Sequence, residues 1–184
     1  IMGDVLYYEN NRNVANGTQL PVVSKDVDSV RAYQFEVEFT GAKGGGDIQN
    51  MTLAAKQVGP TGFSVADIEV NRVNDKVFYP GKPTPESLTI TFDNILKDDV
   101  DTDLWNWFKG TYDPTTGFLG DISDHKINVL KVHQLEHDLS LRSSTEYYGV
   151  YPSAYKLAEW NYATNDFHTI EVTFRYDFMA QVTK

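Results

Sequence analysis

Polar and apolar residues alternate without a break over residues 169–178. The polar positions are Thr169, Glu171, Thr173, Arg175 and Asp177, and the apolar positions between them are Ile170, Val172, Phe174, Tyr176 and Phe178. Since successive side chains of a β-strand point to opposite faces, one face of this segment is apolar and the other is polar. The pattern predicts a half-buried strand whose core-facing row is the apolar set.

Similar alternation or apolar runs predict most of the other elements. Strands are expected at residues 33–40, 51–58, 63–73, 88–92, 127–132, 147–151 and 155–157. Within residues 63–73 the apolar positions change phase, which indicates a bulge at Ala66 or Asp67. Residues 71–87 are rich in proline yet contain apolar residues, and they predict a long loop or hairpin with an apolar tip.

The sequence predicts a single short helix. The acidic residues Asp98, Asp99, Asp101 and Asp103 precede Leu104, Trp107 and Phe108, and Gly110 follows as a stop signal. Many strands and one helix indicate a mainly β fold of two packed antiparallel sheets, a β-sandwich or partly closed barrel, with one short flanking helix. Residues 31–184 form one domain in this interpretation, and residues 1–30 form an N-terminal arm with one short edge strand.

Composition narrows the function classes. The chain has 26 acidic and 16 basic residues, which gives a formal charge of −10. This charge disfavours a protein that binds nucleic-acid duplexes by neutralising their phosphates. It has no cysteine, so disulfides and thiolate ligands are excluded. No run of 18 apolar residues and no targeting signal occur, so no membrane association is expected.

One motif deserves a chemical test. Residues 133–137 read His-Gln-Leu-Glu-His, the order of an inverted zinc-peptidase motif. The motif continues a predicted strand, on which His133 and His137 would lie about 13 Å apart, too far to share one ion. A solvated strand end followed by a turn is the simpler interpretation. With no other recognisable nucleophile, phosphate loop or calcium loop, we expect no catalytic, cofactor or metal site and no enzyme.

The order of these patterns resembles a known family. The resemblance rests on eight features: the corner Tyr148–Pro152, the strand 155–157, Trp160, the turn at Asn165 and Asp166, the closing strand 169–178, and the earlier segments 35–39, 88–94 and 104–108. Together they span roughly Tyr33 to Met179 and resemble the tail tube proteins of contractile-tailed, T-even-like bacteriophages. These are related to the tube proteins of phage-like contractile injection systems.

The resemblance implies a structural virion protein of the inner tail tube. Six subunits would form a hexameric ring in which one sheet of each joins its neighbours in a ring-wide β-barrel, and stacked rings would form a conduit for genome ejection. The implied partners are the tail sheath protein, baseplate and tail-terminator proteins, with the tape-measure protein and DNA transiently in the lumen. The subunit would assemble in the host cytoplasm and end in the phage tail of the virion.

Two alternatives stay open. One is a tube protein of a contractile injection system or bacteriocin, which carries protein effectors instead of DNA. The other, from a different class, is a secreted carbohydrate-binding β-sandwich module, because the chain is rich in tyrosine and tryptophan.

Seven residues are candidates for assembly roles. In the family, the region corresponding to residues 71–87 reaches toward the adjacent ring, so Val77, Phe78 and Tyr79 are the candidates for ring stacking. On polar faces of predicted strands, the candidates for lining the lumen are Glu36, Glu38, Glu69 and Glu171.

Overall fold

The computed structural model describes residues 12–15, 18–21, 30–41, 48–96, 99–163 and 165–183. The chain divides into two units, residues 1–34 and residues 35–184. In the first unit, β1 (Arg12–Ala15) and β2 (Thr18–Pro21) pair antiparallel. This part of the predicted arm therefore holds a strand pair where one edge strand was predicted.

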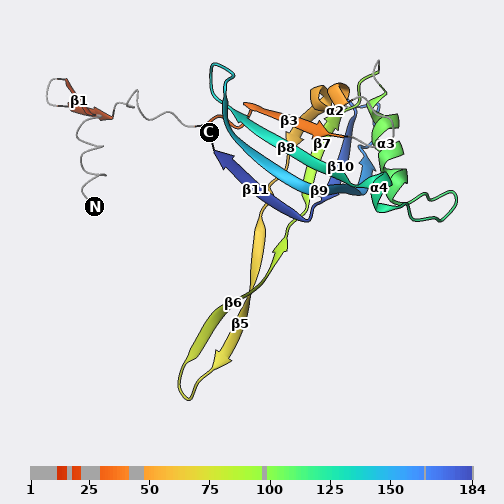
Figure 1. Ribbon diagram of the computed structural model, residues 1–184. Helices are drawn as coiled ribbons and strands as arrows, with labels where there is room; N and C mark the ends of the chain where they lie inside the picture. Colours follow the sequence, from red (N-terminus) through yellow and green to blue (C-terminus); the bar gives the residue numbers. More distant parts are fainter. Residues whose placement is uncertain are drawn as a thin grey trace. The chain divides into compact units, whose positions relative to one another are not determined.

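The second unit is built from two antiparallel sheets, as predicted (Figure 1). The strand order is β3 (Phe35–Thr40), β8 (Ile127–Leu135), β9 (Leu141–Leu157), β10 (Thr169–Arg175), β7 (Leu88–Asp93) and β4 (Ala55–Val58), and β11 (Phe178–Thr183) also pairs with β9. Strand β9 has 17 residues and belongs to both sheets. Its first half pairs with β8 and β11, and its second half pairs with β10.

The two sheets are named here by their outer faces. The charged sheet consists of β3, β8, the first half of β9 and β11. The threonine-rich sheet consists of the second half of β9 with β10, β7 and β4, and its outer face carries Thr89, Thr91, Thr169 and Thr173. On both sheets the polar residues of each alternating strand lie outside, because the apolar residues between them are buried.

Aromatic rings fill the space between the sheets. Phe39 of the charged sheet lies 6.1 Å from Phe92 and 6.4 Å from Phe174 of the threonine-rich sheet, measured between ring centroids. All three side chains are buried. The predicted core row of the closing strand is confirmed for Ile170, Val172, Phe174 and Tyr176.

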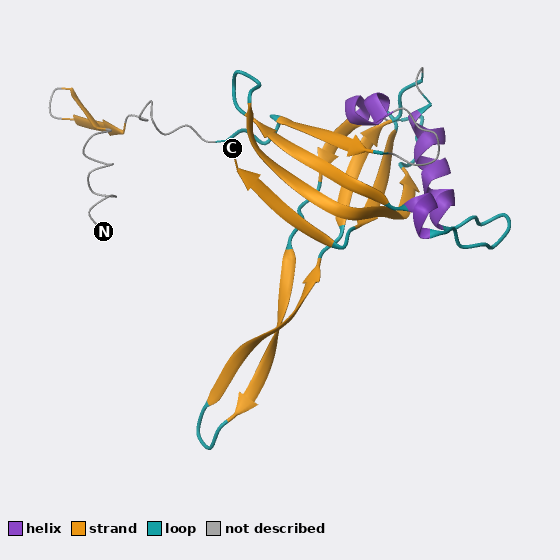
Figure 2. Ribbon diagram, in the orientation of Figure 1, coloured by secondary structure: helices purple, strands orange, loops and turns teal. Residues whose placement is uncertain are grey.

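Helices lie on one side of the sheets (Figure 2). The main helix, α3 (Val100–Thr111), inserts Trp107 between the sheets, where its ring centroid lies 5.3 Å from that of Phe174. The Trp107 indole N–H donates to the backbone oxygen of His125, the last residue of the short helix α4 (Ile122–His125). The predicted stop at Gly110 is wrong. Gly110 is the eleventh residue of α3, and the helix ends at Thr111, with Tyr112 in extended conformation.

Residues 51–58 were predicted to be a strand, and this is half wrong. Helix α2 (Ile48–Ala54) occupies the first part, and β4 begins only at Ala55. Met51 and Ala54 lie three positions apart and are both buried, a helical spacing that the short apolar run concealed.

The closing strand also differs from its prediction. It ends at Arg175, and β11 then begins at Phe178 in the other sheet. Phe178 was predicted to face the core, but its side chain is 53% exposed and stacks on Tyr148, with ring centroids 4.5 Å apart. The sequence keeps its period of two while the chain changes sheets, so alternation alone does not reveal the break.

Strands β5 (Phe63–Asn71) and β6 (Lys76–Pro85) form a hairpin whose turn lies at residues 72–75. The hairpin predicted within residues 71–87 therefore begins earlier, and its predicted apolar tip is wrong, because Val77, Phe78 and Tyr79 lie within β6. The two strands pair only with each other among the described residues, and the hairpin extends away from the sheets (Figure 1). The pairing shifts between Val65 and Asp67, which confirms the predicted bulge. At the bulge a Cβ on Gly81 would lie 2.6 Å from the backbone oxygen of Ala66, so only glycine fits there.

Candidate functional site: the charged sheet and the hairpin

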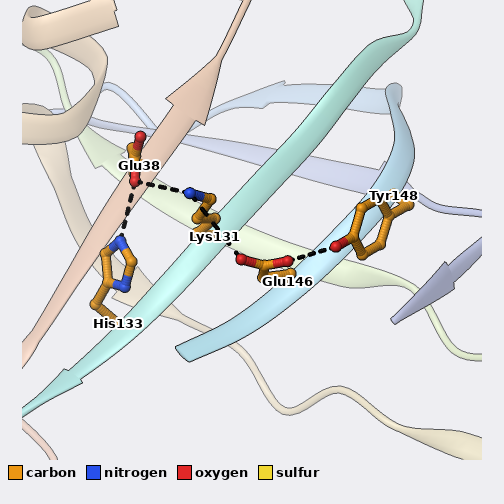
Figure 3. A network of polar contacts seen from close by, with 5 residues as sticks. All are labelled: Glu38, Lys131, His133, Glu146 and Tyr148. Carbon is orange, nitrogen blue, oxygen red and sulfur yellow. Dashed lines mark hydrogen bonds and ion pairs between the residues drawn. The ribbon is translucent and has the colours of Figure 1, made fainter. Parts of the chain in front are cut away.

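The outer face of the charged sheet carries a row of charged residues from three neighbouring strands. Lys131 on β8 lies opposite Glu38 on β3 and opposite Glu146 on β9 in the strand register. Directly paired residues of an antiparallel ladder point to the same side, so the three side chains lie together. Figure 3 shows this row, with His133 beside Glu38 and Tyr148 beside Glu146.

The contacts in the row are continuous. The Lys131 ammonium lies 3.6 Å from Oε2 of Glu38 and 4.0 Å from Oε1 of Glu146. The Nε2 atom of His133 lies 3.1 Å from the same Glu38 oxygen, and the Tyr148 hydroxyl donates to Glu146. Two carboxylates therefore share one lysine, and the row keeps an excess of negative charge.

These contacts shift two pKa values. The hydrogen bond from His133 is the main cause that lowers the pKa of Glu38, and the Lys131 charge adds to it. The hydrogen bond to Glu146 raises the pKa of the Tyr148 hydroxyl, because ionisation would remove the donated proton and place two negative charges together. The first shift favours the ionised form of Glu38, and the second favours the neutral form of Tyr148.

His133 is not the solvated strand end that the sequence predicted. Its side chain is only 15% exposed, and the predicted strand continues through it to Leu135. Its Nδ1 atom and the hydroxyl of Ser144, the residue opposite it on β9, are both buried and make no hydrogen bond with the described residues. Helical spacing, which the zinc motif requires, is absent here. The described residues contain no group of three or more histidine, aspartate or glutamate side chains that could hold a metal ion.

The charged sheet ends in two free edges. Strand β3 pairs with β8 alone and β11 pairs with β9 alone, within the part of the chain that the structure describes. Each edge strand has six residues. A free edge exposes unpaired backbone N–H and C=O groups, which favour pairing with another strand.

The hairpin has two unlike faces near its tip. Ile68 lies opposite Tyr79 and Val70 lies opposite Val77, so these four apolar residues share one face. The other face carries Glu69 opposite Phe78, and Glu69 also pairs with Lys76 at 2.7 Å. The side chains of Tyr79 and Phe78 are 48% and 58% exposed. The stacking candidates thus divide, Val77 and Tyr79 on the apolar face and Phe78 on the mixed face.

The four glutamate candidates do not lie on one surface. Glu36 and Glu38 share the outer face of the charged sheet, whereas Glu171 lies on the threonine-rich sheet, where it pairs with Lys156 at 3.2 Å. Glu69 belongs to the hairpin. Glu146, the third carboxylate of the charged face, was missed, although the alternation of residues 144–148 could have indicated it.

None of the helices within the described residues is long and apolar enough to cross a membrane.

This chain is similar to known proteins in structure and not in sequence. No family model matches the chain, and no curated protein matches its sequence. Among solved structures it is similar to a chain from the cap of the anti-feeding prophage, a tube-terminating cap, with a TM-score of 0.66 and 12% identity, covering 86% of this chain and 93% of that one.

A second similar chain comes from the sheath–tube complex of the extracellular contractile injection system PVC. Its TM-score is 0.66 at 15% identity, and the match covers 85% of this chain and 93% of that chain. A type six secretion system protein matches with a TM-score of 0.52 and 12% identity, over 82% of this chain and 83% of that one. The matched chains of the cap and the sheath–tube complex belong to structural assemblies and not to enzymes. The chain has the fold of the tube and cap proteins of contractile injection systems.

Proposed function

We propose that this protein is the subunit of the inner tail tube of a contractile phage tail. The observation that carries the proposal is the charged sheet with its two free six-residue edges, within a fold shared with tube and cap proteins. In a ring, β11 of each subunit would pair with β3 of the next. Every free edge would then be satisfied by assembly.

The strand directions allow such a ring to close. Each strand of the charged sheet is antiparallel to its neighbour, and the order is β3, β8, β9, β11. With an even number of strands, the two edge strands run in opposite directions. Subunits related by rotation about the ring axis therefore bring β11 against β3 antiparallel, continuing the ladder without a change of type. We propose hexameric rings. Another similar chain comes from the 6-fold symmetrised structure of the anti-feeding prophage baseplate, which supports this number.

The outer face of the charged sheet would line the channel. Glu36, Glu38 and Glu146 outnumber Lys131 there, so the wall would repel phosphates. At physiological salt this repulsion reaches only about 8 Å, so it would prevent adhesion at the wall without excluding DNA from the lumen. Glu69 and Glu171 lie outside this face, so the proposal gives them no place in the channel.

The hairpin would connect successive rings. A heterologous contact that does not close produces an open stack, which is the geometry of a tube. Val77 and Tyr79 of the apolar face, together with Phe78, would pack on a copy in the adjacent ring. Each buried apolar side chain contributes about 1.5–3 kcal/mol before the costs of association.

A tube subunit implies further partners. Tail sheath, baseplate and terminator proteins would contact it from outside and at its ends, the tape-measure protein and DNA would pass through it, and residues 1–30 would form an arm. A tube that carries protein effectors is the second candidate, favoured by the origin of the similar structures in injection systems. The particle would be released as a virion in the first case.

Electron microscopy of the purified protein tests the proposal, with hexameric rings or tubes as the expected result. Two proline variants test whether the free edge of β11 pairs with the next subunit. In an edge strand, neighbouring N–H groups point to opposite sides, so one of Ala180→Pro and Gln181→Pro removes a bond to β9 and the other removes the bond to the next subunit. The variant that removes the bond to the next subunit should stay folded without forming rings. Dispersed wild-type monomers at all concentrations would refute the proposal.

A further inference from the structure

An aromatic socket lies at one end of the threonine-rich sheet, in the connection between β9 and β10. It is a cavity of about 370 Å³ whose lining includes Glu159, Trp160, Asp166, Phe167 and His168. The Trp160 ring stacks on His168, with centroids 3.9 Å apart and planes 14° apart. The Trp160 side chain is nevertheless 75% exposed, so its second face is open to a ligand.

The socket is fixed to the sheet through His168. Its Nε2 atom lies 3.2 Å from the backbone oxygen of Ala158, and its Nδ1 atom lies 3.4 Å from the amide nitrogen of Asn94. The backbone N–H of Asn94 also donates to the backbone oxygen of His168 at 3.0 Å. His168 thus holds the Trp160 ring in place, which lowers the entropy cost of binding at this surface.

The chemistry of the socket suits a cation. Glu159 and Asp166 are exposed and form no ion pair with the residues that the structure describes. An open tryptophan face next to two carboxylates favours a guanidinium group, which can stack on the ring and donate to both acids. An arginine side chain is therefore the ligand that fits best.

The tip of the hairpin offers such a group. The backbone N–H of Arg72 donates to the oxygen of Asp75 at 2.7 Å, closing the tip around Val73 and Asn74. Val73 is 98% exposed, and the Arg72 side chain has no ion pair within the described part of the chain. The tip thus presents the Arg72 cation and the apolar Val73 side chain, beside the exposed carboxylate of Asp75.

The tip and the socket leave the threonine-rich sheet at opposite ends. The hairpin lies between the last residue of β4, Val58, and the first residue of β7, Leu88. The socket follows the end of β9 and precedes Thr169 of β10, which lies opposite Asp93, the last residue of β7. A head-to-tail stack of copies would therefore direct the tip of one copy toward the socket end of the next.

We propose that the aromatic socket receives the hairpin tip of a second copy of this chain, with Arg72 on the Trp160 ring between Glu159 and Asp166. This inference rests on the proposed stacking of rings and names the surface that receives the hairpin. It also gives the stack a polarity, because the tip and the socket are different surfaces.

Disulfide trapping tests the contact without background, because the chain has no cysteine. Tubes of the double variant Asn74→Cys, Phe167→Cys should give a ladder of covalent multimers on a non-reducing gel after oxidation. The matched control is Asn74→Cys with Leu119→Cys, since Leu119 is 79% exposed but lies beyond the far end of α3. The control should give no ladder. Tubes of the first variant without a ladder above the control would overturn the socket, while the proposed tube would stand.

Charge exchange provides the second measurement. Arg72→Glu and Glu159→Arg should each reduce the amount of protein that sediments as tubes by about tenfold, and the double exchange should restore it. Rings should persist in every variant, because the charged sheet is unchanged. Single variants that form normal tubes, or a double exchange that restores nothing, would overturn the contact. Failure of the wild-type protein to form rings or tubes would instead refute the proposed function itself.

Discussion

The Lys126 ammonium lies 2.8 Å from Oδ2 of Asp177, at the point where the chain passes from the threonine-rich sheet to the charged sheet. The same carboxylate fills the space beside Gly149, whose φ of +66° is a left-handed conformation. A glycine, a lysine and an aspartate from three segments therefore fix the crossover between the sheets.

Replacement of Gly149 should be costly. A Cβ at this position would lie 2.1 Å from Asp177 Oδ2, so Gly149→Ala combines backbone strain with a collision at the crossover. The matched control is Gly117→Ala, where φ is +74° but nothing lies within 4 Å of the added carbon. We expect about 1 kcal/mol of destabilisation for the control and a larger loss for Gly149→Ala, measured by urea denaturation. Equal losses would show that the collision is relieved without cost.

Phe174 should contribute strongly to stability. Its side chain is fully buried among Phe39 and Trp107, so Phe174→Ala should reduce the free energy of unfolding by about 3–5 kcal/mol through lost burial and a cavity. Phe178→Ala removes the same atoms from a half-exposed site. It should cost clearly less in the same denaturation experiment, and comparable losses would contradict the exposed placement of Phe178.

Glu38 should make stability depend on pH. Its pKa is lower in the folded chain than the ordinary 4.5, so the unfolded chain binds the proton more readily. The stabilisation is present above pH 4.5 and is lost as the pH falls through the lowered value. It should be less than about 1 kcal/mol, because the Glu38 side chain is 47% exposed.

Carboxyl NMR can measure this titration directly. In the His133→Leu variant, whose side chain cannot donate a hydrogen bond, the Glu38 midpoint should move upward, because the main cause of the shift is the His133 hydrogen bond. A Lys131→Gln variant should raise the midpoint less. The opposite order of the two variants would contradict the assigned cause.

The hairpin faces should differ in their effect on tube growth. Val77→Thr with Tyr79→Thr changes the apolar face, whereas Phe78→Thr changes only the mixed face. The first variant should leave rings that do not elongate, and the second should have the smaller effect, by electron microscopy and sedimentation. Normal tubes from the Val77 and Tyr79 double variant would remove the apolar face from the contact.

Thiol labelling can decide which sheet lines the channel. Glu36→Cys and Glu171→Cys place one thiol on each outer face of a chain that has no other cysteine. A maleimide attached to a polymer too large to enter a channel should label both variants as free subunits. In tubes it should label only the Glu171→Cys variant, and the reverse result would place the threonine-rich sheet at the lumen.

Period-two patterning predicted the sheets well and the ends of elements poorly. The strands at residues 88–92 and 169–175 and the bulge near Ala66 were predictable because the buried and exposed rows alternate there. Helix α2 was missed, since a short apolar run within seven residues does not distinguish a helix from a strand by periodicity.

The candidate site was only partly predictable. Glu36 and Glu38 were found on an alternating strand, but Glu146 joins them through strand register, a long-range relationship that a local pattern does not contain. The exposed position of Phe178 was not predictable for the same reason. Its side chain packs on Tyr148 only because the chain changes sheets at Asp177.

Strand β9 has a mechanical consequence. It extends over about 55 Å at 3.3 Å per residue and forms ladders with β8, β10 and β11. Tension along one sheet therefore passes to the other through a continuous covalent backbone instead of through side-chain contacts. The ladders on β9 resist such a load in shear, where many hydrogen bonds share the force, and not by peeling one bond after another.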